Sequence, residues 1–218
     1  LAFRRYAQAG FNVRHRAAYI WDDDLDTALD YARLLKRNDW IVDLIQLADV
    51  PGGDLSSYSL IVVGHDTGYG YDFDDQAAAG ALAQWTAPIL GLGDGGASLF
   101  SEYGLNIGFG HTWISDNHEV YPVAPATAYW NHPHAIEVGD QTAVLLYGEA
   151  LPELGVYLPD PLKTVTPIAR EAKDADHYPV IEELNGAREF VLWGYNLGPK
   201  AMTEEGRALL VNVTHALR

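Results

Sequence analysis

The chain has 218 residues, enough for one α/β domain with a large buried core, and 48% of them are hydrophobic. Its 14 basic and 30 acidic side chains give a formal net charge of -16, although Arg4, Arg5, Arg14 and Arg16 crowd the first positions. This acidic excess argues against nucleic acid and anionic membranes as partners, and leaves small neutral or cationic ligands, sugars and other proteins open. The absence of cysteine excludes disulfides, thiolate metal sites and a Cys nucleophile.

The sequence shows no signal of membrane insertion, and its first residues are those expected of a domain from a longer protein or of a mature form. No apolar run is long enough to span a membrane, and the first residues lack the design of a signal peptide. Residues 1–15 show no clear periodicity and are expected to form an arm or a linker. Because the chain begins at Leu1 rather than Met, we expect residues 1–218 to be a single domain of a longer protein or a mature form. An extracellular or cell-surface location is favoured over the cytoplasm.

Short apolar runs alternate with amphipathic stretches in the first half of the chain. Helices are predicted from Leu25 and from Ala77, capped by an aspartate among residues 22–24 and by Asp74 or Asp75. The strands between them are predicted at 17–21, 41–47, 60–63 and 88–92. This βαβ order predicts a flavodoxin-like three-layer sandwich with a mostly parallel central sheet and right-handed crossovers.

Prolines, aromatic residues and short β-type runs replace this alternation beyond Gly104, which is expected to end a third helix. Asn185-Gly186 is a strong two-residue turn signal, and a last helix is predicted from Thr203 through Val213. We therefore expect β-hairpins to be added to the sheet in the second half. Their strands are predicted at 107–114, 135–138, 143–147, 156–158, 165–169, 180–184 and 190–195.

A glycine-rich turn follows the fourth predicted strand and leads into a helix. The spacing of Gly91, Gly93 and Gly96 matches a dinucleotide fingerprint, but this turn does not follow the first strand, and Asp94 would set a carboxylate beside a diphosphate. The turn also fits a nucleophile elbow in which Gly93 stands in place of the nucleophile. Alternatively, the glycines serve only the close packing of helix on strand. We favour an empty elbow or close packing over a dinucleotide site.

The order of elements and three local motifs resemble the class I glutamine amidotransferase-like superfamily. The motifs are the third strand with its glycine loop (Ile61 to Gly64), the elbow (Pro88 to Gly96), and the sequence FVLWGYN at 190–196 before the last helix. Trp-Gly endings of this kind also occur in the trehalose-utilisation-like branch, whose members lack the amidotransferase triad. The resemblance covers most of the chain and implies a flavodoxin-like fold.

The catalytic residues of that superfamily are missing at the matching positions. The family's Cys falls on Gly93, and its His and Glu fall around Gly194 to Asn196, where neither is present. Without a thiolate and a base no acyl-enzyme can form, whatever oxyanion-binding amide survives at Asp94. We therefore expect no glutaminase activity, and predict a catalytically degenerate domain that serves as a binding or interaction module of a longer protein.

Polar side chains should converge at the carboxyl edge of the sheet, because the first, third and fourth strands are neighbours in the flavodoxin-like order. Asp22, Asp66 and Asp94 are candidate ligands for Ca²⁺ or Mg²⁺, or could hydrogen-bond a sugar or peptide. The alternative function is a hydrolase or lyase acting on a sugar or small amide, with Asp94 or Asp66 as general base and His65 as acid or metal ligand. Equally, the aspartates could only cap a helix and satisfy turn amides.

The remaining motifs are less specific. His132 and His134, like Asp116 and His118, lie two residues apart, but zinc would need a third ligand, so we expect them in loops. Asn212 begins a glycosylation sequon but falls on a predicted helix. A carbohydrate- or partner-binding surface could be formed by five aromatic residues: Tyr69, Tyr71, Phe73, Tyr129 and Trp130. Packing in the core explains the presence of these residues equally well.

Overall fold

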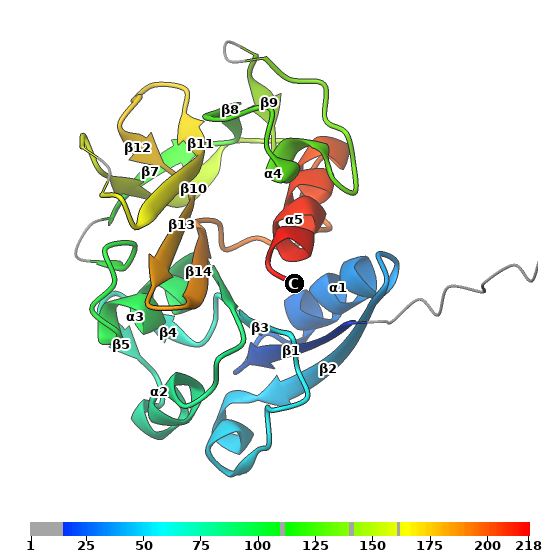
Figure 1. Cartoon of the computed structure of the whole chain (residues 1–218), viewed down its shortest axis with the longest axis vertical. Helices are drawn as coiled ribbons and strands as arrows, with labels where there is room; N and C mark the ends of the chain where they lie inside the picture. Colours follow the sequence, from blue (N-terminus) through cyan, green and yellow to red (C-terminus); the bar gives the residue numbers. More distant parts are fainter. Residues whose placement is uncertain (1–14, 110–111, 140–141, 161) are drawn as a thin grey trace, which may run out of the picture.

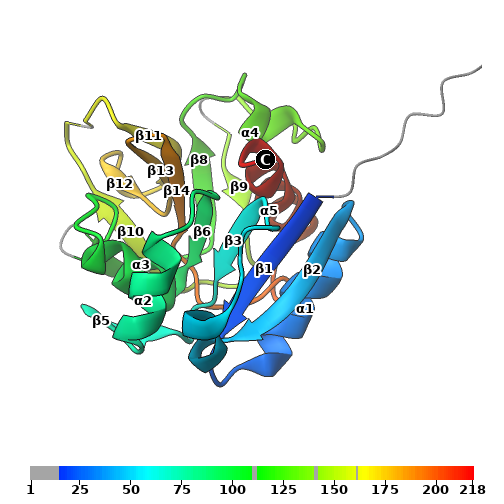
Figure 2. The same cartoon turned by 60° about the horizontal axis from the view of Figure 1, so that its bottom comes forward.

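A nine-stranded mixed sheet, with the order β2-β1-β3-β6-β14-β13-β11-β8-β9, forms the centre of the molecule (Figure 1, Figure 2). The structure is a computed structural model that describes residues 15–109, 112–139, 142–160 and 162–218. The parallel half consists of β1 (His15–Trp21), β2 (Trp40–Gln46), β3 (Leu60–Val63), β6 (Ile89–Leu92) and β14 (Arg188–Trp193). The antiparallel half consists of β13 (Val180–Asn185), β11 (Val165–Glu171), β8 (Glu119–Pro122) and β9 (Val144–Leu145).

Two smaller sheets lie beside the large one. A three-stranded sheet has the order β12-β10-β7, and a two-stranded ribbon pairs β4 with β5. Their strands are β7 (Thr112–Asn117), β10 (Leu151–Tyr157), β12 (His177–Tyr178), β4 (Gly68–Tyr69) and β5 (Asp72–Phe73). The fold is therefore α/β with parallel core strands and added antiparallel hairpins, as the sequence predicts, although the antiparallel part is larger than a mostly parallel sheet would have.

Helices cover both faces of the parallel half (Figure 2). They are α1 (Leu25–Lys36), α2 (Gln76–Ala83), α3 (Gly93–Glu102), α4 (Ala128–Asn131) and α5 (Glu204–Ala216), with a 3-10 segment at Leu47–Gly52. The helix starts follow from capping. Asp24 accepts a hydrogen bond from the Thr27 N–H, Asp75 caps α2, and the Thr203 hydroxyl caps α5. The predicted caps are thus confirmed, with Asp75 rather than Asp74 at α2.

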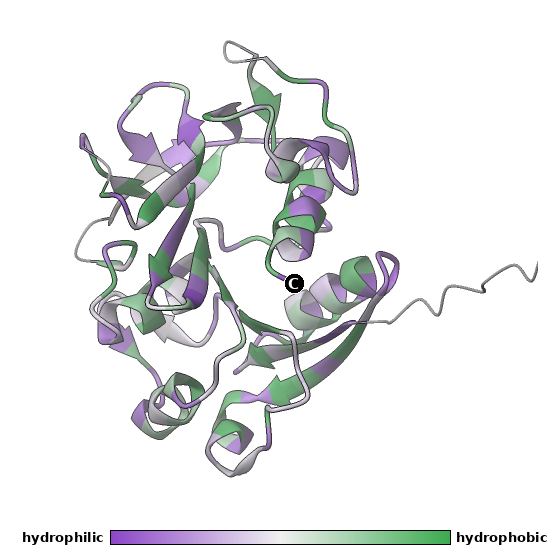
Figure 3. Ribbon diagram, in the orientation of Figure 1, coloured by the Kyte–Doolittle hydropathy of each residue, from purple (hydrophilic) through white to green (hydrophobic). Residues whose placement is uncertain are grey.

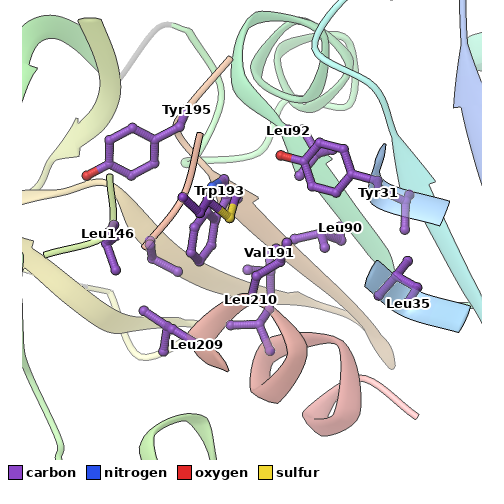
Figure 4. Close-up of a cluster of buried hydrophobic side chains, with 14 of the residues drawn as sticks. Tyr31, Leu35, Leu90, Leu92, Leu146, Val191, Trp193, Tyr195, Leu209 and Leu210 are labelled. Carbon is purple, nitrogen blue, oxygen red and sulfur yellow. The ribbon is translucent and has the colours of Figure 1, made fainter. Parts of the chain in front are cut away.

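Successive residues of the central strands enter different cores, because side chains alternate across a strand. One core lies between the sheet and helices α1 and α5, and the other lies under α2 and α3. Figure 3 shows hydrophobic stretches along the central strands. Figure 4 shows the first core, which includes Tyr31, Leu35, Leu90, Val191, Trp193, Leu209 and Leu210. Each such side chain contributes about 1.5–3 kcal/mol when fully buried, so these two cores fix the parallel half of the sheet.

The turn prediction at Asn185-Gly186 is confirmed by the hairpin of β13 and β14, in which Gly186 has a φ of 66°. Several strand predictions in the second half are wrong. Residues 135–138 form no strand, because their backbone bonds elsewhere: the Ile136 N–H donates to the Trp130 carbonyl. Residues 107–109 also stay outside the sheet, since the Phe109 N–H donates to the Ser101 hydroxyl. Of the strand predicted at 143–147, only the two residues of β9 pair in the sheet. No strand was predicted from the sequence where β8 lies.

The predicted arm lies outside the described residues, apart from His15, which begins β1. Among the described residues no helix combines the length and the apolar character needed to cross a membrane.

Candidate functional site

The turn between β6 and α3 has the geometry of a nucleophile elbow. Gly93 follows the strand with a φ of 47°, a left-handed conformation that glycine adopts without strain. A Cβ added at Gly96 would lie 2.3 Å from the Gly91 carbonyl carbon, so these two glycines allow the helix to pack directly on the strand. The left-handed turn at Gly93 is compatible with an empty elbow, and the close approach of Gly96 to Gly91 explains those two glycines by the packing of helix on strand.

The side chain of Asn196 fills the space at the tip of the elbow. A Cβ added at Gly93 would lie 1.8 Å from the Asn196 Oδ1 atom. This oxygen accepts a hydrogen bond of 2.9 Å from the Asp94 N–H, and the Asn196 Nδ2 atom donates to the Asp94 carboxylate at 2.6 Å. In a nucleophile elbow, the N–H of the residue after the nucleophile helps to bind the oxyanion. The Asn196 side chain therefore lies where the side chain of a nucleophile would lie. It also accepts a hydrogen bond from the backbone N–H that would bind the oxyanion.

Asp66 has a structural role at the same edge of the sheet. Its Oδ2 atom accepts hydrogen bonds from three consecutive backbone N–H groups, those of Asp22 (3.0 Å), Asp23 (3.0 Å) and Asp24 (2.7 Å). These three bonds connect one side chain to the whole start of the loop that leads into α1. Asp66 therefore holds the β1–α1 loop against the end of β3, and one of its oxygens is fully engaged.

His65 lies beside Asp24 in the same loop cluster, with 3.5 Å between its Nε2 atom and the Asp24 Oδ2 atom. Burial opposes ionisation of Asp24, but hydrogen bonds from Thr27 and the nearby imidazole outweigh it and lower the pKa of the carboxyl. The Nδ1 atom of His65 is buried and has no hydrogen-bond partner among the described residues. The structure therefore brings His65 to Asp24, while Asp94 pairs with Asn196.

Acidic side chains from two loops create a negative potential at this edge. Burial, followed by the charges of Asp23 and Asp66, raises the pKa of Asp22. The same causes, with the charge of Asp72 in addition, raise the pKa of Asp74. The predicted convergence of the loops after β1 and β3 is thus observed.

Two tyrosines extend this surface along the β4–β5 ribbon. The side chains of Tyr69 and Tyr71 are 77% and 65% exposed. The Ser98 hydroxyl donates to the Gly70 carbonyl, so the tip of the ribbon rests on α3. We call these residues the carboxyl-edge surface: Asp22, Asp23, Tyr69, Tyr71, Asp72 and Asp74.

The other predicted aromatic contacts need correction. Phe73 and Trp130 are buried in the cores, and Tyr129 is half-buried and donates to Glu182. They do not belong to an exposed aromatic surface.

The remaining histidine motifs lie in other parts of the structure. His134 contacts Asn38 through its Nε2 atom, and Asn212 is buried and donates to the carbonyls of Tyr129 and His134. These contacts explain the sequon residue as a bridge between α5 and the loop around α4. In the described part of the chain, the three-residue group of metal-ligating side chains lies between β10 and β12 of the three-stranded sheet and the end of β11, not at the carboxyl edge. Calcium or magnesium at Asp22, Asp66 and Asp94 stays a prediction.

Comparison with known proteins identifies the fold. No family model and no curated protein matches the chain. Among solved structures, a protein described as ThuA-like from Bacteroides uniformis superposes with a TM-score of 0.63 at 14% identity, over 97% of this chain and 93% of that one. PurLQS from Thermotoga maritima gives 0.60 at 15% identity, over 94% and 100%. The glutaminase domain of Trypanosoma brucei CTPS, with bound acivicin, gives 0.54 at 12% identity, over 93% of each chain.

The chain therefore has the class I glutamine amidotransferase-like fold. It has no cysteine anywhere, so the catalytic thiol of that class is absent. The contact of Asn196 with Asp94 was not predicted from the sequence. The signal that could have pointed to it is a polar residue three positions after the end of the buried strand β14.

Proposed function

We propose that this protein is a catalytically degenerate amidotransferase-like domain that serves as a binding module of a longer protein. The observation that carries the proposal is the replacement of the nucleophile by Gly93 and of its surroundings by the Asn196 amide, which already uses the Asp94 N–H. Thiol-dependent glutaminase chemistry needs both a nucleophile and a free oxyanion-binding donor. A domain that retains this fold without a nucleophile and without a free oxyanion-binding N–H is suited to binding a ligand rather than to acyl transfer.

The carboxyl-edge surface is the proposed binding site. In open α/β sheets ligands bind outside the carboxyl ends of the strands. Exposed tyrosine rings offer faces for sugars and for cations, and the aspartates around them favour neutral or cationic groups over anions. The net charge of -16 supports the same choice of ligand class.

The test is a binding titration with two probes, a neutral oligosaccharide and a lysine- and arginine-rich peptide, followed by calorimetry. Binding of either probe that is lost in the Tyr69→Ala/Tyr71→Ala variant supports the proposal, and the Asp72→Asn/Asp74→Asn variant should weaken the peptide more than the sugar. Tyr157→Ala, which changes an exposed tyrosine on β10, is the matched control. Binding that survives both double variants would place the site elsewhere.

A second candidate is a hydrolase or lyase acting on a sugar or small amide through His65. The pairing of His65 with Asp24 favours it, because a carboxylate beside an imidazole can orient the ring toward a substrate. If Asp66 and Asp94 bind calcium or magnesium, either ion should raise the melting temperature, and Asp66→Asn with Asp94→Asn should abolish the shift. Turnover of amide or glycoside substrates that is absent in His65→Gln would favour this candidate. A melting curve indifferent to ion and chelator would remove its metal-assisted form.

A further inference from the structure

A fully buried group of ionisable side chains lies where the three-stranded sheet meets the end of β11 of the nine-stranded sheet. It consists of Glu153 on β10, Glu171 at the end of β11 and His177 at the start of β12, with exposures of 1%, 3% and 0%. The His177 Nδ1 atom lies 2.6 Å from the Glu171 Oε2 atom and 3.4 Å from the Glu153 Oε1 atom. One ligand atom from each residue falls within 4.8 Å of the other two. Three successive strands thus bring two carboxylates and an imidazole to one buried point.

The surrounding chain fixes the orientation of these groups. A Cβ added at Gly155 would lie 2.4 Å from the His177 Cε1 atom, so glycine at this position leaves room for the ring. The Asn117 Nδ2 atom donates to the Glu153 Oε2 atom at 3.3 Å. Tyr195 pairs with Glu153 through an antiparallel β-bridge, which fixes the backbone at that carboxylate. Partners of this kind orient the first ligands in protein metal sites.

The chemistry of the group favours a divalent cation. Two carboxylates and a protonated imidazole sum to a charge of -1, whereas two carboxylates, a neutral imidazole and a divalent ion sum to zero. Buried carboxylates are costly unless a cation or a proton compensates them. Imidazole nitrogen suits zinc and other transition metals, and carboxylates add manganese to the candidates. The mixed set therefore selects a transition metal over Ca²⁺ or Mg²⁺, whose ligands are oxygens.

We propose that Glu153, Glu171 and His177 bind one Zn²⁺ or Mn²⁺ ion with a structural role. Bonds of about 2.1 Å in a tetrahedron set ligand atoms about 3.4 Å apart, which matches the His177–Glu153 distance. The shorter His177–Glu171 distance must open by about 0.8 Å on the same basis, a movement that a carboxylate can make by rotating its own side chain. The bound ion ties β10, β11 and β12 together next to Tyr195, the residue before Asn196.

The experiment uses the whole chain, stripped with a chelator and then titrated with ZnCl₂ or MnCl₂ by calorimetry and thermal melting. We expect one ion per chain. At a free concentration one hundred times Kd, the melting temperature should rise by about 5–10 °C. The Glu171→Gln and His177→Gln variants should lose both effects, while Glu182→Gln, a half-buried glutamate on β13, should keep them. The Asp66→Asn/Asp94→Asn variant should also keep them, which separates this site from the carboxyl edge.

Two outcomes overturn the proposal. In the first, neither ion binds the wild-type chain in stoichiometric amount and the melting curve is the same with ion and with chelator, which would show that hydrogen bonds within the protein hold the three side chains. In the second, binding persists in Glu171→Gln and His177→Gln. Because the wild-type melting curve decides the first outcome by itself, a variant that fails to fold does not remove the test.

Discussion

The contact between Gly93 and Asn196 can be tested by a double-mutant cycle. Placing alanine at position 93 forces a side chain into a left-handed conformation, which costs about 1–2 kcal/mol. The new Cβ would also lie 1.8 Å from the Asn196 Oδ1 atom, so Asn196 must move and give up its two hydrogen bonds to Asp94. One of these bonds involves a carboxylate, and together they contribute about 2–3 kcal/mol. Gly93→Ala should therefore lower the free energy of unfolding by about 3–5 kcal/mol in total.

Asn196→Ala removes the same two hydrogen bonds and should lower the free energy of unfolding by about 2–3 kcal/mol. In the double variant the clash is absent, so the loss should be about 3–5 kcal/mol instead of the additive 5–8, a coupling of about 2–3 kcal/mol. Urea unfolding followed by tryptophan fluorescence measures all four chains. Gly104→Ala is the matched control, because Gly104 has a φ of 65° with no atom within 4 Å of an added Cβ. Equal losses for Gly93→Ala and Gly104→Ala, or strictly additive losses in the cycle, would show that Asn196 does not occupy the space at Gly93.

Two further predictions concern the acidic loops. Asp66→Asn weakens the acceptor of three backbone N–H groups and should lower the free energy of unfolding, measured in urea, by about 1–3 kcal/mol. Asp72→Asn, on the exposed ribbon, should leave the free energy of unfolding almost unchanged. Equal effects of the two substitutions would contradict the structural role of Asp66. The folded-state pKa values of Asp22 and Asp74 are raised, so the stability they contribute is present at low pH and is lost as the pH rises through those values. Asp22→Asn/Asp74→Asn should therefore raise the melting temperature at pH 7, with a gain that shrinks with salt and vanishes at about pH 3; a gain that is independent of pH would exclude this cause.

The first half of the fold could be predicted because its signals are local. The helix from Leu25 and the strands around it have clear periodicity, and the aspartates that cap the helices stand next to them in the sequence. The second half was harder, since its strands are short and contain Pro and Gly, as in β10. There the pairing of strands is set by contacts between distant segments. Residues 135–138, predicted as a strand, form none because their backbone makes other contacts.

The candidate functional residues show the same contrast between local signals and contacts between distant segments. The elbow at Gly93 could be found from the spacing of glycines, but the contact between Asn196 and Asp94 joins residues 102 positions apart. The bonds from Asp66 to the β1–α1 loop span more than forty positions, so its structural role was also hidden. Glu153, Glu171 and His177 resemble ordinary strand residues one at a time, and only the folded chain brings them together.

The absence of glutaminase activity is best tested by measuring ammonia release from glutamine. The wild-type chain should release no more ammonia than a heat-denatured sample, because it lacks a thiol and because Asn196 holds the Asp94 N–H. The Gly93→Cys/Asn196→Gly variant should carry a thiol that reacts with iodoacetamide and still release none, since the residues after β14 provide no base. Release by the wild-type chain that is lost in Asp94→Asn would contradict the account.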